Sequence, residues 1–136
     1  MAASPQSVVA IFNTSPDTVE MLRVMLQHAG FLAASAFTYD IRDGRVDLDS
    51  FVRRNNPLVI VYDVAPPYES NWALFQRLRE DPALQACQFV ITSTNAAQVQ
   101  ALAGRDERIY EIVGKPYDLD LIVRAVKEAS RARSVR

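Results

Sequence analysis

The strongest constraint on the fold is an uninterrupted apolar run at residues 58–62 that ends directly in an aspartate, Asp63. A run of this length, rich in β-branched residues and without polar alternation, is typical of a strand buried on both faces of a sheet. Both faces are buried when helices pack on each side, which is the arrangement of parallel sheets. We therefore expect an α/β protein in which Asp63 follows a central strand.

Other strand-like segments alternate with segments of helical period along the rest of the chain. The polar stretch through Asp43 and Gly44 is expected to be a loop, since it carries turn residues and no apolar period. The pattern predicts a doubly wound, five-stranded parallel sheet with helices on both faces. The remaining strands are predicted at 8–12, 31–37, 89–91 and 110–113, and the helices at 16–29, 48–54, 72–79, 96–103 and from Asp118 onward.

The length of 136 residues matches one domain of ordinary size. We expect a single domain over 1–136, with its core at about 7–130 and a basic tail at 131–136. The 15 basic residues nearly balance the 16 acidic ones, so neither nucleic acid nor a membrane surface is an expected partner. The basic residues of the last helix are favoured by the dipole of a helix C-terminus.

Neither a secretion signal nor a membrane span is expected from the sequence. The apolar runs have the length of strands, far below the ~20 residues that a spanning helix needs. Cys87 is the only cysteine, which excludes an internal disulfide and a thiolate metal cluster, and we expect it to be a small buried residue. These features favour a cytoplasmic protein.

Polar residues gather where the predicted strands end. In an open parallel sheet, reactive groups collect outside the carboxyl ends of the strands. The first strand ends in Asn13 and Thr14, the third in Asp63, the fourth in Thr92, and the fifth leads to Lys115. A carboxylate that attacks phosphorus, with a hydroxyl and an ammonium group to bind the phosphoryl oxygens, would suit phosphoryl transfer.

Three short segments in this order carry a family resemblance. They are Asp63 with Pro67 four residues later, Thr92 after an apolar run, and Lys115 followed by Pro116. With these segments, residues 7–130 resemble the receiver domains of bacterial two-component response regulators, which have a flavodoxin-like (βα)5 fold. The resemblance implies Asp63 as phosphoacceptor, Thr92 as switch hydroxyl, Lys115 as phosphoryl partner and a cis peptide bond at Pro116.

The resemblance also implies a signalling role rather than an enzyme, beyond phosphorylation and dephosphorylation of Asp63 itself. Implied partners are a histidine kinase or another signalling protein, and an output domain. A second copy of the chain could pair through the face formed by helix 96–103, strand 110–113 and the last helix. Small residues on helix 96–103 would permit close approach: Ala96, Ala97, Ala101 and Ala103.

Two departures from the family pattern bear on mechanism. The family holds Mg²⁺ with an acidic pair at the end of the first strand, where this chain has Asn13 and Thr14; Ala65 occupies a third metal-site position. Asp63 and Lys115 alone have no net formal charge, so the electrostatic drive for a divalent ion is small. We therefore expect no required cofactor and weak or absent Mg²⁺ at Asp63.

The second departure is Ile112, three residues before Lys115, where the family has an aromatic switch residue. A β-branched side chain cannot reorient between two wells as an aromatic one does. We therefore favour a weakly phosphorylated or phosphorylation-independent interaction module, a pseudo-receiver. The alternative is an active receiver switched at Asp63. A small enzyme on the same fold is disfavoured, because the glycines are isolated and Ser93 replaces the arginine that a phosphatase loop at Cys87 would need.

Overall fold

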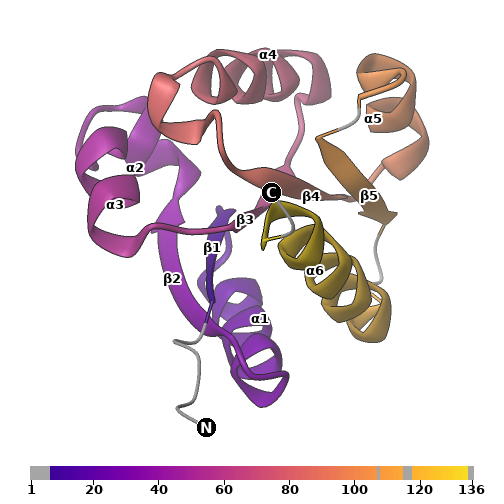
Figure 1. The fold of residues 1–136 in the computed structure, drawn as a ribbon. Coiled ribbons are helices and arrows are strands. Elements are labelled where there is room, and N and C mark those ends of the chain that lie inside the picture. The colour runs from indigo at the N-terminus through magenta and orange to yellow at the C-terminus, as the bar shows by residue number, and fades with distance from the viewer. Residues whose placement is uncertain (1–6, 107, 115–117, 135–136) are drawn as a thin grey trace, which may run out of the picture.

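The computed structural model describes residues 7–106, 108–114 and 118–134. Its centre is a five-stranded parallel sheet in the order β2-β1-β3-β4-β5 (Figure 1). This order confirms the doubly wound, flavodoxin-like architecture that the sequence predicts. The strands are β1 Val8–Asn13, β2 Leu32–Phe37, β3 Val59–Val64, β4 Gln88–Ser93 and β5 Ile109–Gly114.

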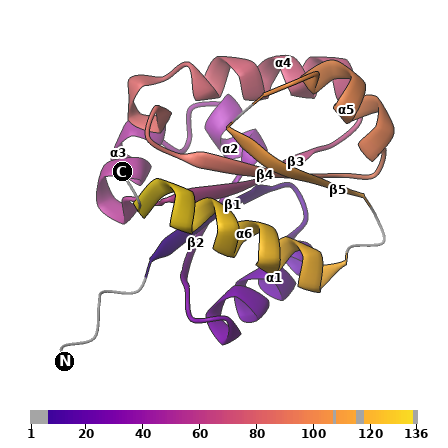
Figure 2. The ribbon, with the colours of Figure 1, turned by 45° about the vertical axis from the view of Figure 1, so that its right-hand side comes forward.

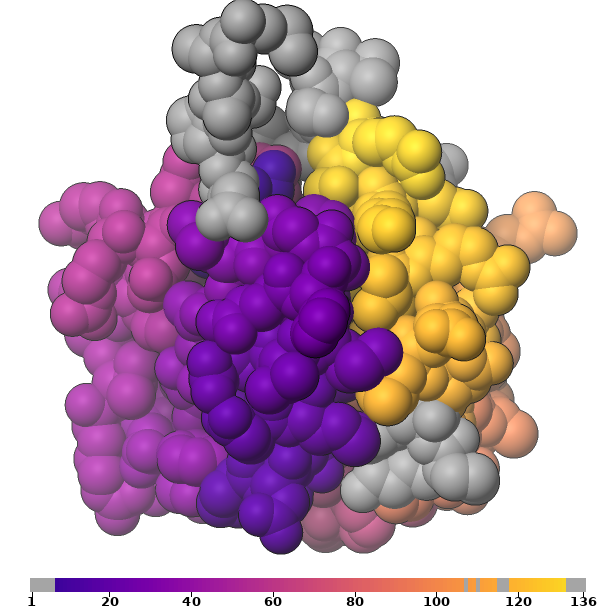
Figure 3. Space-filling view, turned by 90° about the horizontal axis from the view of Figure 1, so that it is seen from below, coloured from indigo at the N-terminus to yellow at the C-terminus, as the bar shows by residue number. Residues whose placement is uncertain are grey.

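Helices cover both faces of the sheet. Figure 2 shows α4 and α5 on one side of the strands and α1 and α6 on the other, and in Figure 3 α1 and α6 lie side by side across that second face. No helix within the described ranges is long and apolar enough to span a bilayer. The helices are α1 Pro16–His28, α2 Thr38–Arg42, α3 Leu48–Asn55, α4 Tyr68–Arg79, the short 3-10 helix η1 Pro82–Leu84, α5 Ala96–Ala103 and α6 Leu119–Ser134.

Strand β3 is buried along its whole length, as its unbroken apolar run predicts. Ile60 and Tyr62 point to the side of α3, α4 and α5, whereas Val59 and Val61 point to the side of α1 and α6. Trp72 is buried and packs against Phe75 with ring centroids 5.1 Å apart. Two apolar layers therefore hold the end of β3 in a fixed position.

The helices that carry sequence signals at their ends lie where they were predicted. Ser15 caps α1 by accepting a hydrogen bond from the backbone of Thr18, and Pro16 is the first helical residue. Asp118 accepts a hydrogen bond from the backbone of Leu121 at the start of α6. Helix α5 ends before Gly104, whose φ of +60° suits glycine.

Two helices differ from the prediction. The segment expected as a loop contains α2, and α4 begins at Tyr68, four residues before the predicted start at 72. Neither helix has a side-chain N-cap, so the sequence lacks the usual start signal. Helix α2 is only five residues long, and its buried Ile41 packs against the core. Tertiary packing therefore replaces the missing local signals.

Candidate functional site

The carboxyl ends of β1 and β3 lie next to each other at the centre of one sheet edge. The chain runs from β1 to β2 on one side, while β3 lies on the other, so this is the topological switch point of the sheet. Phe12 and Tyr62 are paired in the β1–β3 ladder, one residue before Asn13 and Asp63. The fold thus brings Asn13 and Asp63 to the place where ligands bind in such sheets.

Asp63 is in direct contact with Thr92. The two residues are paired in the β3–β4 ladder, and the hydroxyl of Thr92 donates a hydrogen bond of 2.7 Å to Oδ1 of Asp63. Thr92 is fully buried and Asp63 is only 8% exposed, so water competes little for this bond. Two of the three predicted site residues therefore meet; Lys115 and the peptide bond at Pro116 lie outside the described residues.

Asn13 uses its side-chain oxygen locally. Its Oδ1 accepts hydrogen bonds from the backbone of Thr14 at 2.7 Å and of Ser15 at 3.0 Å, which fixes the turn into α1. The side chain is buried, with 3% exposed. The side-chain oxygen of Asn13 is thereby already committed to two donors within the turn.

A cleft of about 390 Å³ opens beside Asp63. It extends between α2, the end of β3 and the start of α4. Asp63 is its one carboxylate; the other polar side chains carry hydroxyls, an amide or a guanidinium. The lining residues are Thr14, Thr38, Tyr39, Arg42, Tyr62, Asp63, Ala65, Pro66, Pro67, Ser70, Asn71 and Leu74.

These residues do not fit a magnesium site. Mg²⁺ prefers hard carboxylate oxygens in an octahedral shell, whereas the cleft offers one carboxylate, and that group already accepts from Thr92. Arg42 adds positive charge to the same lining, and Ala65 offers no side-chain oxygen. Within the described ranges, no three acidic, histidine or cysteine residues form a potential metal site.

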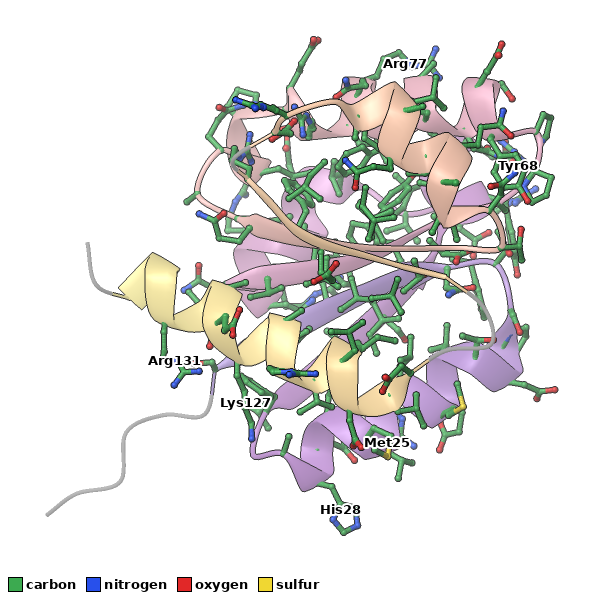
Figure 4. All side chains as sticks on the ribbon, turned by 90° about the vertical axis from the view of Figure 1, so that its right-hand side faces the viewer. Met25, His28, Tyr68, Arg77, Lys127 and Arg131 are labelled. Carbon is green, nitrogen blue, oxygen red and sulfur yellow. The ribbon has the colours of Figure 1, made fainter. Side chains whose placement is uncertain are left out.

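The ends of β3 and β4 and the segments that follow them are tied together beside the cleft. Ser93 donates a hydrogen bond of 2.9 Å to the carbonyl of Val64, and the hydroxyl of Tyr68 is hydrogen-bonded to Thr94. Figure 4 shows Tyr68 at this edge of the molecule. Ile112 pairs with Ile91 in the β4–β5 ladder and packs against the core. The wall of the site is therefore braced on the side of β4.

Sequence reasoning missed Thr38, Tyr39 and Arg42 as site residues. They reach the cleft because α2 follows β2 directly. The sequence predicts a loop in place of α2, so it does not direct these side chains to the site. The sequence places Tyr62 in the strand that becomes β3 and gives it no role in the site, although its side chain also lines the cleft. Burial, and secondarily the charge of Asp63, raise the pKa of Tyr62 far above its ordinary value, so its hydroxyl stays protonated.

A second hollow, of about 480 Å³, lies between α1 and α6. Met25 and Lys127 line it, and Figure 4 shows both near the junction of these helices. His28 is the last residue of α1 and also lines this hollow. The hollow is separate from the cleft at Asp63, with which it shares no lining residue.

In sequence, neither a protein-family model nor a curated protein matches this chain. In structure, a sensor protein from a Polaromonas species is similar with a TM-score of 0.74 at 20% identity, over 95% of this chain and 99% of that one. A response regulator from Thermotoga maritima has a TM-score of 0.72 at 19% identity, over 93% and 99%. A response regulator receiver domain from Clostridium thermocellum has a TM-score of 0.71 at 13% identity, over 95% and 98%. The chain therefore has the receiver-domain fold.

Proposed function

We propose that this chain is a receiver-type signalling domain with Asp63 at the phosphoacceptor position, and that it acts mainly through protein contacts. The hydrogen bond between Thr92 and Asp63 carries this proposal. It joins a hydroxyl and a carboxylate at the switch point of a receiver fold, where the family resemblance places its phosphoacceptor and switch residues. Lys115 is proposed as the third member, the partner of the phosphoryl group.

The donor set at the strand ends supports a metal-poor receiver. Asn13 and Thr14 replace carboxylates, and the oxygen of Asn13 already accepts two backbone hydrogen bonds. Weak Mg²⁺ binding would make phosphorylation of Asp63 slow. We therefore favour a module that is weakly phosphorylated or works independently of phosphorylation. No enzymatic turnover of a metabolite is part of this proposal.

A fully active receiver remains the second candidate. The specific observation in its favour is that Thr92 already contacts Asp63, as a switch hydroxyl must when it binds a phosphoryl oxygen. Ile112 stands against it, since this partly buried aliphatic residue packs against the core at the position of the family's aromatic switch. The two candidates differ in how fast Asp63 takes up a phosphoryl group and in whether Mg²⁺ is needed.

The proposed partners are proteins: a histidine kinase or another signalling protein of the cytoplasm, and an output domain. The face formed by α5, β5 and α6 is proposed for pairing with a second copy. On α5, Ala97 and Ala101 are exposed, and Leu102 is 36% exposed. Sedimentation that shows only monomer at high concentration would exclude this homodimer.

The test of the main proposal is incubation with acetyl phosphate and Mg²⁺, followed by intact mass measurement. We expect a slow, partial gain of one phosphoryl group that is lost in Asp63→Asn. Asparagine keeps the size of the side chain and an oxygen that can accept from Thr92 but removes the nucleophilic carboxylate. Rapid and complete modification that requires Mg²⁺ would favour the active receiver instead. A modification that persists in Asp63→Asn would remove Asp63 from its proposed role.

A further inference from the structure

Helix α2 brings a guanidinium group to the same cleft that contains Asp63. Arg42 is the last residue of this short helix and lines the cleft together with Asp63 and Thr14. In a receiver that lacks an acidic metal site, a cation at this place has a specific consequence. It can balance the charge of an oxyanion in the cleft without a divalent ion.

The hydrogen bonding of Arg42 leaves its phosphate-binding groups available. Its Nε donates to Oδ1 of Asp43 at 3.2 Å, which orients the guanidinium plane. The terminal nitrogens Nη1 and Nη2 have no acceptor among the residues that the structure describes. The side chain is 53% exposed, so a ligand can reach it. A planar guanidinium binds phosphate oxygens through two parallel hydrogen bonds.

Hydroxyl groups supply further donors around the cleft. Thr14, Thr38, Tyr39 and Tyr62 line it, and in the described part of the chain none of their hydroxyls has a hydrogen-bond partner. As residues, Thr38 is 6% exposed and Tyr62 2%, so packing holds both side chains in place at the wall of the cleft. A hollow that is lined by such donors and a guanidinium fits a phosphate-like oxyanion.

We propose that Arg42 is a cation of this receiver site in addition to the proposed Lys115: it binds the phosphoryl group that Asp63 accepts, so that the transfer proceeds without a divalent metal. This inference rests on the proposed function, in which Asp63 is the phosphoacceptor. It goes further by assigning a phosphoryl-binding role to a residue of α2 and by making the slow phosphorylation of Asp63 independent of Mg²⁺.

The transfer step balances with a small phosphodonor such as acetyl phosphate. A carboxylate oxygen of Asp63 attacks the phosphorus atom, and a new oxygen–phosphorus bond forms as the bond to the acetate oxygen breaks. Acetate leaves with the electron pair, and no proton needs to move. Arg42 donates hydrogen bonds to the phosphoryl oxygens while charge accumulates on them, which lowers the barrier.

The experiment measures the modification rate of the full chain with acetyl phosphate by intact mass, once in EDTA and once with Mg²⁺. The variants are Arg42→Gln, Arg42→Lys and a matched control, Arg45→Gln. Arg45 carries the same charge and also pairs with Asp43, but it is not among the residues lining the cleft. Circular dichroism verifies the fold of each variant.

We expect the wild-type rate to agree within about twofold with and without Mg²⁺. Arg42→Gln should slow the reaction at least about tenfold, less than the ~10²–10³-fold cost of removing a preorganised oxyanion-hole donor, because Arg42 is half exposed. Arg42→Lys keeps the charge but loses the bidentate geometry, so its rate should lie between those of the wild type and Arg42→Gln. Arg45→Gln should react like the wild type.

Two results would overturn the inference, and they differ in what they mean for the proposed function. If Mg²⁺ accelerates the wild type more than about tenfold and Arg42→Gln changes nothing, Arg42 has no part, while Asp63 keeps its role. If no phosphoryl group is gained in any arm, the Arg42 inference also fails, and the chain is left as an interaction module without phosphorylation.

Discussion

Arginines lie at both edges of the sheet, but their surroundings differ. At the amino edge, Arg79 forms an ion pair with Asp106. The side chain of Arg79 is 18% exposed and that of Asp106 is 15% exposed. Arg108 donates to the backbone carbonyls of Leu84 and Cys87. At the carboxyl edge, Arg42 is 53% exposed and only its Nε has an acceptor in the described part of the chain.

The difference suggests that the two edges of the sheet have different roles. Both arginines of the amino edge also lie over aromatic rings, Arg108 at 5.0 Å from the centroid of Phe89 and Arg79 at 5.4 Å from that of Phe75. Burial, and then the charge of Arg79, lower the pKa of Arg108 below its ordinary value, but not enough to remove its charge. This edge holds η1, β4 and β5 together, whereas the carboxyl edge keeps its donors available for a ligand.

The largest effect on stability is expected from Arg108→Ala. The change removes the donors to two carbonyls and the contact with Phe89, and it should lower the free energy of unfolding by about 2–3 kcal/mol. Arg42→Ala, at the opposite edge, should change it by less than about 0.5 kcal/mol, because its ion pair is exposed. Urea unfolding measures both. Equal losses in the two variants would break the comparison between the edges.

The sequence predicts the sheet better than it predicts the cleft. Continuous apolar runs locate β3 and β4, and cap residues such as Ser15 locate the start of α1. Asp63 and Thr92 could be predicted as neighbours because parallel strands end at the same edge. These inferences depend on local patterns and on topology alone.

The role of Arg42 could not be predicted from the same patterns. It depends on α2, a five-residue helix without a side-chain cap, which forms because Ile41 packs into the core. In the sequence, Arg42 precedes a polar turn at Asp43 and Gly44 and resembles a surface charge. Only the packed structure shows that it faces the same cleft as Asp63.

A smaller effect is expected from Thr92→Val at the carboxyl edge. Valine preserves the shape of the buried side chain but removes the donor to Asp63, so we expect a loss of about 1 kcal/mol in unfolding free energy. Valine's apolar fit at a fully buried position offsets part of the lost hydrogen bond. Urea unfolding of Thr92→Val, alone and combined with Asp63→Ala, measures the coupling.

In the Asp63→Ala background the loss on Thr92→Val should shrink, because the acceptor is already gone. A loss of the same size in both backgrounds would show that Thr92 contributes only by packing. The hydrogen bond between Thr92 and Asp63 would then add nothing to stability, and the carboxyl edge would depend on the apolar layers beneath it.

The smallest effect concerns the ion pair that orients Arg42. The hydrogen bond from Arg42 lowers the pKa of Asp43 below its usual value, and the charges of Arg42 and Arg45 add to this. Because the folded-state pKa is lowered, the contact stabilises the fold at pH values above the unfolded-state pKa of Asp43. This contribution is lost as the pH falls through the folded-state pKa. Because Asp43 is exposed, the change in stability should be slight.

An NMR titration of the Asp43 carboxyl carbon tests this contact directly. Arg42→Gln should raise the pKa of Asp43 toward its ordinary value, and Arg45→Gln should raise it less, since the hydrogen bond from Arg42 is the largest cause of the lowered pKa and the charge of Arg45 the smallest. An unchanged pKa in Arg42→Gln would mean that Asp43 does not orient the guanidinium. If the pKa stays low when Asp63 carries a phosphoryl group, the contact between Nε of Arg42 and Asp43 persists in the phosphorylated state.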